Sequence, residues 1–166
     1  MSPAASQPVT FDVNVLVEAV AGEPRAFWAW PSPPPLSGNP AANCVGIVND
    51  AQEFGLWLSA HILANVLRVL AALNWTEDKA VEYVTLLRDI AIESGGGIIE
   101  PSVRVDDCPD YEDNRILELG LASGSVLIVS NDGDLLTMSP WRGIPIVTPA
   151  DFAGRVDAMR RAGRRR

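Results

Sequence analysis

The sequence predicts an α/β domain, a three-layer sandwich in which a parallel sheet lies between helices. Two observations predict it: short apolar segments alternate with amphipathic helical segments along most of the 166 residues, and hydrophobic residues make up 48% of the chain. Alternating strands and helices favour a parallel sheet covered on both faces. The hydrophobic content is sufficient for a core and differs from that of disordered chains. No apolar run approaches the roughly 20 residues that span a bilayer, so we expect no membrane segment.

The first half of the chain contains two predicted strands. The segment VTFDV is a short strand that ends at Asp12, and a helix is expected over 13–20. Residues 31–40 contain five of the thirteen prolines, which predicts a long exposed loop. The segment GLWLS is a second strand, and Ser59 at its end is suited to cap a helix with apolar residues at helical spacing. Thr76 is suited to cap the next helix.

The second half contains three predicted strands and two predicted helices. The segment GGGII indicates a tight turn into a short strand. A helix is expected to begin at Asp110, a good N-cap residue, and to end at Gly124, a good helix terminator. The segments SVLIVS and IPIV are the last two strands. Thr148 is placed to cap the final helix, with Pro149 in its first position and Asp151 in its first turn.

Charge is distributed unevenly along the chain, whose formal net charge is −8. Residues 155–166 contain six arginines and one aspartate, and the rest of the chain carries 7 basic and 20 acidic residues. An acidic body differs from the basic surfaces of nucleic-acid-binding proteins, and it fits a focused acidic site in which metal ions restore the balance of charge. We therefore predict one domain over 1–154, which includes the proline-rich loop 31–40, followed by a basic tail over 155–166.

The cysteines and the first residues bear on the compartment. Cys44 and Cys108 are too few for a disulfide framework, and the chain has no C-x-x-C pair for zinc. The opening segment MSPAASQPVT has neither a basic residue nor an apolar signal core, so secretion is not expected. A reduced, cytoplasmic protein is the simplest interpretation.

Four aspartates at predicted strand and helix ends are candidate site residues: Asp12, Asp113, Asp132 and Asp134. Parallel sheets bind ligands beyond the carboxyl ends of their strands, where the strand order reverses. If the strands before Asp12 and Asp132 are neighbours at that point, these two acids meet. Each acid also has an ordinary role open to it, as a turn residue, a helix cap or a member of a helix start. A turn alone explains one acid in SNDGDLL well and two acids poorly.

Carboxylates that converge in a small crevice repel each other, and a divalent cation relieves this repulsion. Mg²⁺ and Mn²⁺ prefer carboxylate and water oxygens as ligands. Such a site polarises a phosphodiester and activates a water molecule for its hydrolysis. The pattern of acids therefore points to metal-dependent phosphodiester chemistry.

Four motifs, FDVNVLV, DYEDNRILELGLASGS, VLIVSNDGDLL and GIPIVTPADF, resemble those of the PIN-domain family in both order and spacing. The resemblance covers nearly all of residues 8–153. It implies a PIN-like three-layer sandwich with a central parallel sheet of about five strands and helices on both faces. The family includes the VapC-type toxins of bacterial toxin–antitoxin pairs, which are metal-dependent ribonucleases.

The resemblance also implies roles for individual residues. By position, the family's metal-binding acids match Asp12, Asp113 and Asp132. Asp134 matches its accessory catalytic acid, Ser130 matches the small hydroxyl residue beside the acids, and Asn14 matches the asparagine near the first acid.

One position departs from the family pattern. The family usually has a glutamate where this chain has Asn65, in the segment SAHILANVLRVL. Asparagine still offers a carbonyl oxygen, but the site loses one negative charge, and Asp50 or Glu53 is a candidate substitute. His61, the only histidine, lies four residues earlier and can share a helix face with Asn65. A metal or substrate role is open to it, but at the start of a helix a surface or packing role is the simpler interpretation.

The leading functional hypothesis is a Mg²⁺- or Mn²⁺-dependent endoribonuclease, a toxin with RNA as substrate and an antitoxin as partner. The alternative is a non-catalytic PIN-like module that binds RNA or protein. A haloacid-dehalogenase-like phosphatase or a receiver domain is disfavoured, because Asn14 stands where the phosphatase needs a second aspartate and the only lysine, Lys79, is far from any strand end. Homodimer formation is left open.

Basic and aromatic residues outside the acid motifs have two interpretations each. The arginines of the tail either grip RNA phosphates or form a solvated segment; they include Arg160, Arg161, Arg164, Arg165 and Arg166. Trp28 and Trp30 flank the proline-rich loop and either stack on bases or pack in contacts with the core or a partner.

Overall fold

The computed structural model describes residues 6–21 and 38–166. Its centre is a five-stranded sheet in the order β3-β2-β1-β4-β5, in which every neighbouring pair of strands is parallel. The predicted α/β class and parallel sheet are confirmed. The strands are β1 Gln7–Phe11, β2 Phe54–Leu58, β3 Gly97–Ile98, β4 Leu127–Val129 and β5 Ile146–Val147.

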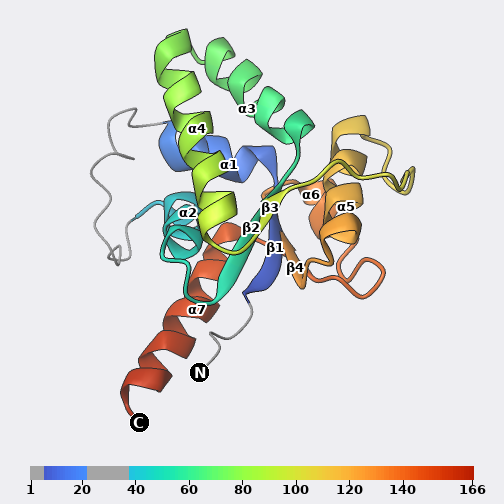
Figure 1. The fold of residues 1–166 in the computed structure, drawn as a ribbon. Helices are drawn as coiled ribbons and strands as arrows, with labels where there is room; N and C mark the ends of the chain where they lie inside the picture. The colour runs from blue at the N-terminus through green and yellow to red at the C-terminus, as the bar shows by residue number, and fades with distance from the viewer. Residues whose placement is uncertain (1–5, 22–37) are drawn as a thin grey trace.

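Helices cover both faces of this sheet, as the three-layer prediction requires. Figure 1 shows α1, α2, α4 and α7 gathered on one side of the strands and α5 and α6 on the other. None of the helices in the described ranges combines the length and apolar character needed to cross a bilayer. The helices are α1 Val13–Ala21, α2 Pro40–Asn49, α3 Ala60–Ala72, α4 Glu77–Glu93, α5 Tyr111–Ser123, α6 Gly133–Leu136 and α7 Pro149–Arg164.

The predicted helix boundaries depend on capping side chains, and the structure confirms four of them. The side chains of Ser59, Thr76, Asp110 and Thr148 each accept a hydrogen bond from a backbone N–H in the first turn of the helix that follows. Such bonds satisfy donors that have no partner within the helix. Gly124 ends α5 in the left-handed conformation, with φ at 65°, where a side chain is disfavoured.

Helix α2 was not predicted from the sequence. Asn39 caps it by accepting a hydrogen bond from the Ala42 N–H at 3.2 Å, and Pro40 is its first residue. Proline at the first helical position needs no N–H partner, so it starts a helix here although it was assigned to a loop. The rest of the predicted loop, residues 31–37, lies outside the described residues, as do Trp28 and Trp30.

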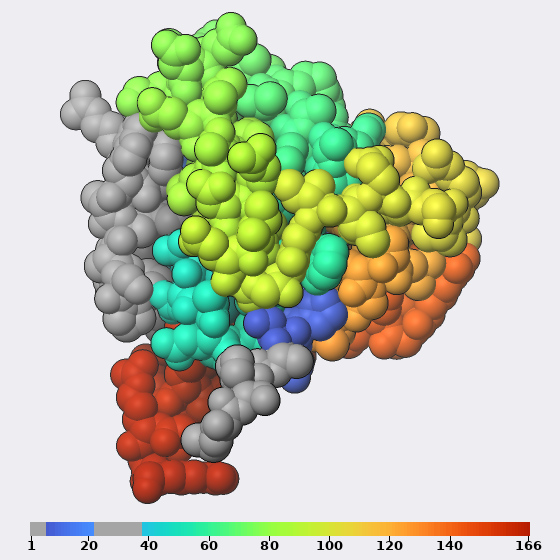
Figure 2. Space-filling model, viewed as in Figure 1, coloured from blue at the N-terminus to red at the C-terminus, as the bar shows by residue number. Residues whose placement is uncertain are grey.

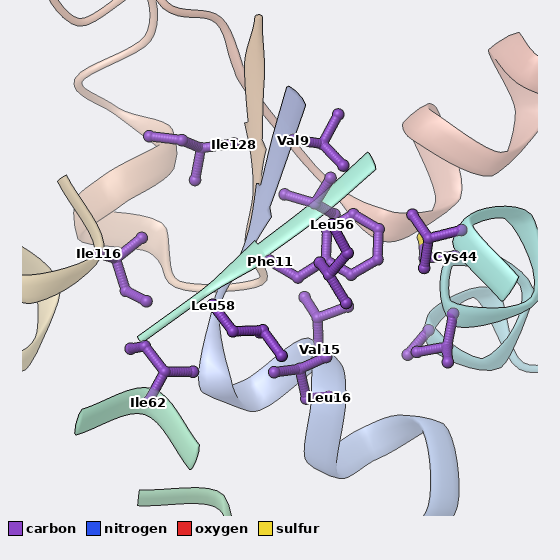
Figure 3. Close-up of a cluster of buried hydrophobic side chains, with 14 of the residues drawn as sticks. Val9, Phe11, Val15, Leu16, Cys44, Leu56, Leu58, Ile62, Ile116 and Ile128 are labelled. Atoms are coloured by element: carbon purple, nitrogen blue, oxygen red, sulfur yellow. The ribbon is translucent and has the colours of Figure 1, made fainter. Parts of the chain in front are cut away.

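The core on the α2 and α7 side of the sheet is built from alternate residues of the strands. Val9 and Phe11 of β1 point to this side, where Figure 3 shows Phe11 close to Val15 and Leu16 of α1. The Phe11 ring also meets the Phe152 ring of α7 edge to face, with centroids 5.8 Å apart. This packing fixes α1 directly after β1 and therefore fixes the position of the residue between them, Asp12.

Helix α7 is continuous from Pro149 to Arg164. The boundary predicted between residues 154 and 155 falls inside it, so the structure shows no break between the domain and a tail. Arg160 is joined to the body: its guanidinium lies 2.9 Å from the Asp50 carboxylate and 2.6 Å from the Glu53 carboxylate. Beyond this anchor the helix projects away from the body (Figure 2).

Replacing Arg160 with alanine should destabilise the protein by roughly 3 kcal/mol, the lower end for removing one partner of a buried ion pair. The reason is that the Asp50 side chain is only 2% exposed and loses its guanidinium partner. Thermal or urea unfolding measures the effect. Arg164→Ala, at the exposed end of the same helix, is the matched control and should leave stability unchanged. Equal stability of the two variants would contradict the anchoring role.

Candidate metal-binding site

The candidate site lies at the point where the strand order reverses. Strand β1 pairs with β2 on one side and with β4 on the other, and Phe11 is in register with Val129. The residues that follow these two strands therefore emerge side by side at the carboxyl edge of the sheet. The first of these residues after β1 is Asp12, and β4 leads into Ser130 and Asp132. The condition under which Asp12 and Asp132 were expected to meet, that their strands be neighbours, is fulfilled.

Asp12 is a buried acid whose two oxygens both accept hydrogen bonds. The Val13 N–H donates to Oδ1 at 2.7 Å, and the Ser130 hydroxyl donates to Oδ2 at 2.6 Å. Only 7% of the residue is exposed. Burial raises the pKa of the Asp12 carboxyl above its usual value, and the bond from Ser130 works in the opposite direction. The two bonds fix the carboxylate at the strand end.

Ser130 links the strand end of β4 to the loop that follows. Its hydroxyl donates to Asp12 and also accepts a hydrogen bond from the Asp132 backbone N–H at 2.9 Å. Asp132 in turn caps α6, because its Oδ1 accepts a bond from the Asp134 N–H at 2.9 Å. The capping role considered for Asp132 in the sequence is therefore present in the structure. The same loop also places both Asp132 and Asp134 at the site.

Asp113 is brought to the site by the first turn of α5. The Asp110 side chain caps this helix and accepts a hydrogen bond from the Asp113 N–H at 3.1 Å. Asp113 is 5% exposed. Burial, followed by the negative charges of nearby acids that include Asp132 and Asp12, raises the pKa of Asp113 to about 7. Near neutral pH, the site therefore holds a carboxyl group that resists ionisation until the local charge is neutralised.

Three carboxylates are close enough to share one cation. Oxygens of Asp113, Asp132 and Asp134 all lie within 4.8 Å of one another, and this group could hold a metal ion. The predicted metal ligands were Asp12, Asp113 and Asp132, with Asp134 as an accessory acid. Asp12 lies outside the group of three, but it lines the same pocket of about 340 Å³ as Asp113 and Asp132.

The donor set fits a divalent cation. Among the described residues, none of the four aspartates forms an ion pair with a lysine, arginine or histidine. Negative charge that no side chain balances is a feature of sites filled by a metal ion. Carboxylate oxygens favour hard cations such as Mg²⁺, Ca²⁺ and Mn²⁺ over soft ones, but the donor set does not choose among them.

Asn65 lies at the site, but not in the manner expected from the sequence. It is buried in α3 and lines the pocket. Its Oδ1, the expected ligand oxygen, accepts a hydrogen bond from Arg68 at 3.2 Å, while its Nδ2 donates to Glu112 at 2.6 Å. Asn14 also lines the pocket, and its Oδ1 accepts from the Asn131 N–H.

The acids suggested as substitutes for the missing glutamate lie elsewhere. Asp50 and Glu53 precede β2, at the amino edge of the sheet, and both pair with Arg160. Glu18 and Glu112 line the acidic pocket instead. The sequence did contain a signal for Glu112, since it neighbours Asp113, but the start of a helix explained its charge without further chemistry.

The arginines proposed to grip RNA do not reach the acids. Helix α7 starts at the carboxyl edge of the sheet and runs toward the edge where β1 begins (Figure 1). Arg160 is held by Asp50 and Glu53, and Arg161 pairs with Asp157 on the same helix at 2.8 Å. The remaining three, exposed at the end of the helix, are Arg164, Arg165 and Arg166.

Fold and site together define a class: an α/β protein with a carboxylate cluster at the switch point of a parallel sheet, suited to a metal ion. No protein-family model matches the sequence, and no curated protein matches it either. The resemblance to the PIN-domain family therefore rests on the motifs and their order alone.

Replacing Asp113 with asparagine should stabilise the metal-free protein at pH 8 and leave it unchanged near pH 4. The folded-state pKa of Asp113, about 7, is above its ordinary 3.8, so folding favours the neutral acid. The resulting stability is complete below about pH 4 and is lost as the pH rises through 7. Asparagine cannot ionise and avoids this loss, which is on the order of 4 kcal/mol.

Thermal unfolding of both proteins in EDTA from pH 4 to pH 8 measures this effect. The exposed Asp89→Asn on α4 controls for the general loss of one negative charge. A constant difference between wild type and Asp113→Asn across the pH range would contradict ionisation of Asp113 as its cause.

Proposed function

We propose that this protein is a metal-dependent endoribonuclease of the PIN type. The observation that carries the proposal is the convergence of Asp113, Asp132 and Asp134 within 4.8 Å, in the same crevice as Asp12, at the switch point of a parallel sheet. Motifs from three distant parts of the chain supply these acids, in the order that the resemblance requires. One helix cap or one turn accounts for any single acid, but it does not account for their meeting.

In this proposal the acids and Arg68 have separate roles in catalysis. Asp113, Asp132 and Asp134 would hold the ion, and a bound Mg²⁺ or Mn²⁺ would supply Lewis-acid activation of water and charge neutralisation at the phosphodiester. Asp12, fixed by Ser130 and by the Val13 N–H, orients the attacking water or completes the ligand set. Arg68 lines the pocket and offers its guanidinium to a phosphate oxygen of the substrate.

The biological part of the proposal, a toxin held in check by an antitoxin, follows from the resemblance to VapC-type proteins. RNA as the substrate has the same origin. A short neighbouring reading frame for a DNA-binding antitoxin would support the toxin assignment independently of any assay.

A second candidate function, a non-catalytic module that binds RNA or protein, is favoured by one observation. Asn65 places a neutral amide in the acidic pocket, and the amide nitrogen, not the oxygen, faces the Glu112 carboxylate. A site that has lost a charged ligand can retain the fold and its binding surface while losing its chemistry. The two candidates differ in a single measurable property, metal-dependent cleavage.

Purified protein should cleave a mixed RNA pool in Mg²⁺ or Mn²⁺ and not in EDTA, leaving 5′-phosphate and 3′-hydroxyl ends. Asp132→Asn should lower the cleavage rate by at least about 100-fold, since even partners outside the ligand shell of a metal contribute 10- to 100-fold. The remote Asp89→Asn should cleave at the wild-type rate. RNA binding without cleavage in either metal would instead support the non-catalytic module.

A further inference from the structure

Glu112 stands at the rim of the acidic pocket, next to Asp113 in the first turn of α5. It lines the same pocket as Asp12, Asp113 and Asp132, and its side chain is 46% exposed. It is not one of the three acids whose oxygens lie within 4.8 Å of one another. Its carboxylate therefore belongs to the pocket without belonging to the tightest group of acids.

Two side chains from α3 hold this carboxylate from the same side. The Asn65 Nδ2 lies 2.6 Å from Glu112 Oε2, and the His61 Nε2 lies 2.7 Å from the same oxygen. His61 and Asn65 are four residues apart, which places them on one face of the helix. The side-chain hydrogen bonds described for Glu112 all reach Oε2, and none reaches Oε1.

The orientation of the Asn65 amide is fixed by its two neighbours. Arg68 can only donate, and its Nη2 lies 3.2 Å from the Asn65 Oδ1. Reversing the amide would set its NH₂ group against a guanidinium and its oxygen 2.6 Å from a carboxylate oxygen. Both contacts would then be repulsive. Asn65 therefore serves as a hydrogen-bond donor toward Glu112.

His61 is also a hydrogen-bond donor toward Glu112. Its Nε2 lies 2.7 Å from Glu112 Oε2 and 3.2 Å from the Asn65 Nδ2. A proton on Nε2 makes the shorter contact a hydrogen bond to a carboxylate, whereas an unprotonated Nε2 would face that carboxylate with a lone pair. Two donors thus converge on one oxygen of Glu112.

We propose that Asn65 and His61 are positioning residues that hold Glu112 as a further working carboxylate of the acidic site. With Oε2 occupied by the two donors, Oε1 would accept a hydrogen bond from a water molecule held by a bound cation. Mg²⁺ keeps several of its waters when bound to protein, so a carboxylate outside the ligand group still acts on it. This inference rests on the proposed function and names an acid that it does not use.

In this proposal the neutral residue Asn65 is not a lost metal ligand but the donor that positions Glu112. An acid there would face Glu112 at hydrogen-bond distance and repel it, so the amide is what allows a glutamate to stand on α5. The negative charge that α3 lacks at Asn65 is supplied by Glu112 of α5. Helices α3 and α5 together therefore provide this part of the acidic pocket.

Binding of Mn²⁺, followed by electron paramagnetic resonance or calorimetry, tests the proposal without an activity assay. Glu112→Gln keeps the size of the side chain and should weaken Mn²⁺ binding by about tenfold, the lower end for residues outside the ligand shell. Asn65→Ala should weaken it by a smaller factor. The double variant should bind no more weakly than Glu112→Gln alone, because Asn65 acts through Glu112. Glu82→Gln, exposed on α4, is the matched control.

The outcomes separate the inference from the proposed function. Unchanged affinity in Glu112→Gln, together with loss of binding in Asp132→Asn, would overturn the inference and leave the metal site standing. Independent losses from Asn65→Ala and Glu112→Gln that multiply in the double variant would overturn the positioning role of Asn65. No Mn²⁺ binding by the wild-type protein would overturn the proposed function itself. Unfolding temperatures in EDTA show whether any variant fails to fold.

Discussion

The parallel pairing of β1 with β4 is the interaction on which the rest of the site depends. It places Phe11 beside Val129, so that Asp12 and Ser130 leave the sheet together and form a hydrogen bond at 2.6 Å. The same bond network continues from Ser130 to the Asp132 backbone. A shift of one residue in the register would move Asp12 away from Ser130 and turn its carboxylate toward the other face of the sheet. The burial of Phe11 against Phe152 opposes such a shift.

Several residues of the site serve the fold and the acid cluster at once. Asp132 caps α6, and Asp110 caps α5 just before Asp113. Capping places carboxylates beside backbone N–H groups, and the N-terminus of the longer helix, α5, also carries a partial positive charge that favours nearby acids. These favourable terms offset part of the cost of gathering the acids but do not remove it, since burial, and after it the charges of neighbouring acids, still raises the pKa of Asp113 to about 7. Local structure therefore assembles the cluster, and a bound cation would complete its charge balance.

The sequence was informative where one residue decides the local structure, and uninformative where distant residues decide it. N-caps such as Ser59 and Thr148 and the glycine that ends α5 follow from short-range chemistry, and they were predicted correctly. The gathering of acids at the strand ends was expected because parallel sheets bind ligands beyond the carboxyl ends of their strands. Helix α2 was missed because its first residue is a proline in a proline-rich segment.

The orientation of Asn65 could not be predicted from the sequence. It depends on Glu112, which is 47 positions away along the chain, and on the guanidinium of Arg68. A comparison of motifs treats position 65 as a lost acid, because it compares residue types at one position. The charge and the hydrogen-bond direction in the pocket depend on side chains of both helices, because Asn65 of α3 and Glu112 of α5 line it together and are joined by a hydrogen bond. Loss of an acid at one position of a carboxylate site therefore predicts loss of metal binding only when no neighbouring helix turns a carboxylate into the same pocket.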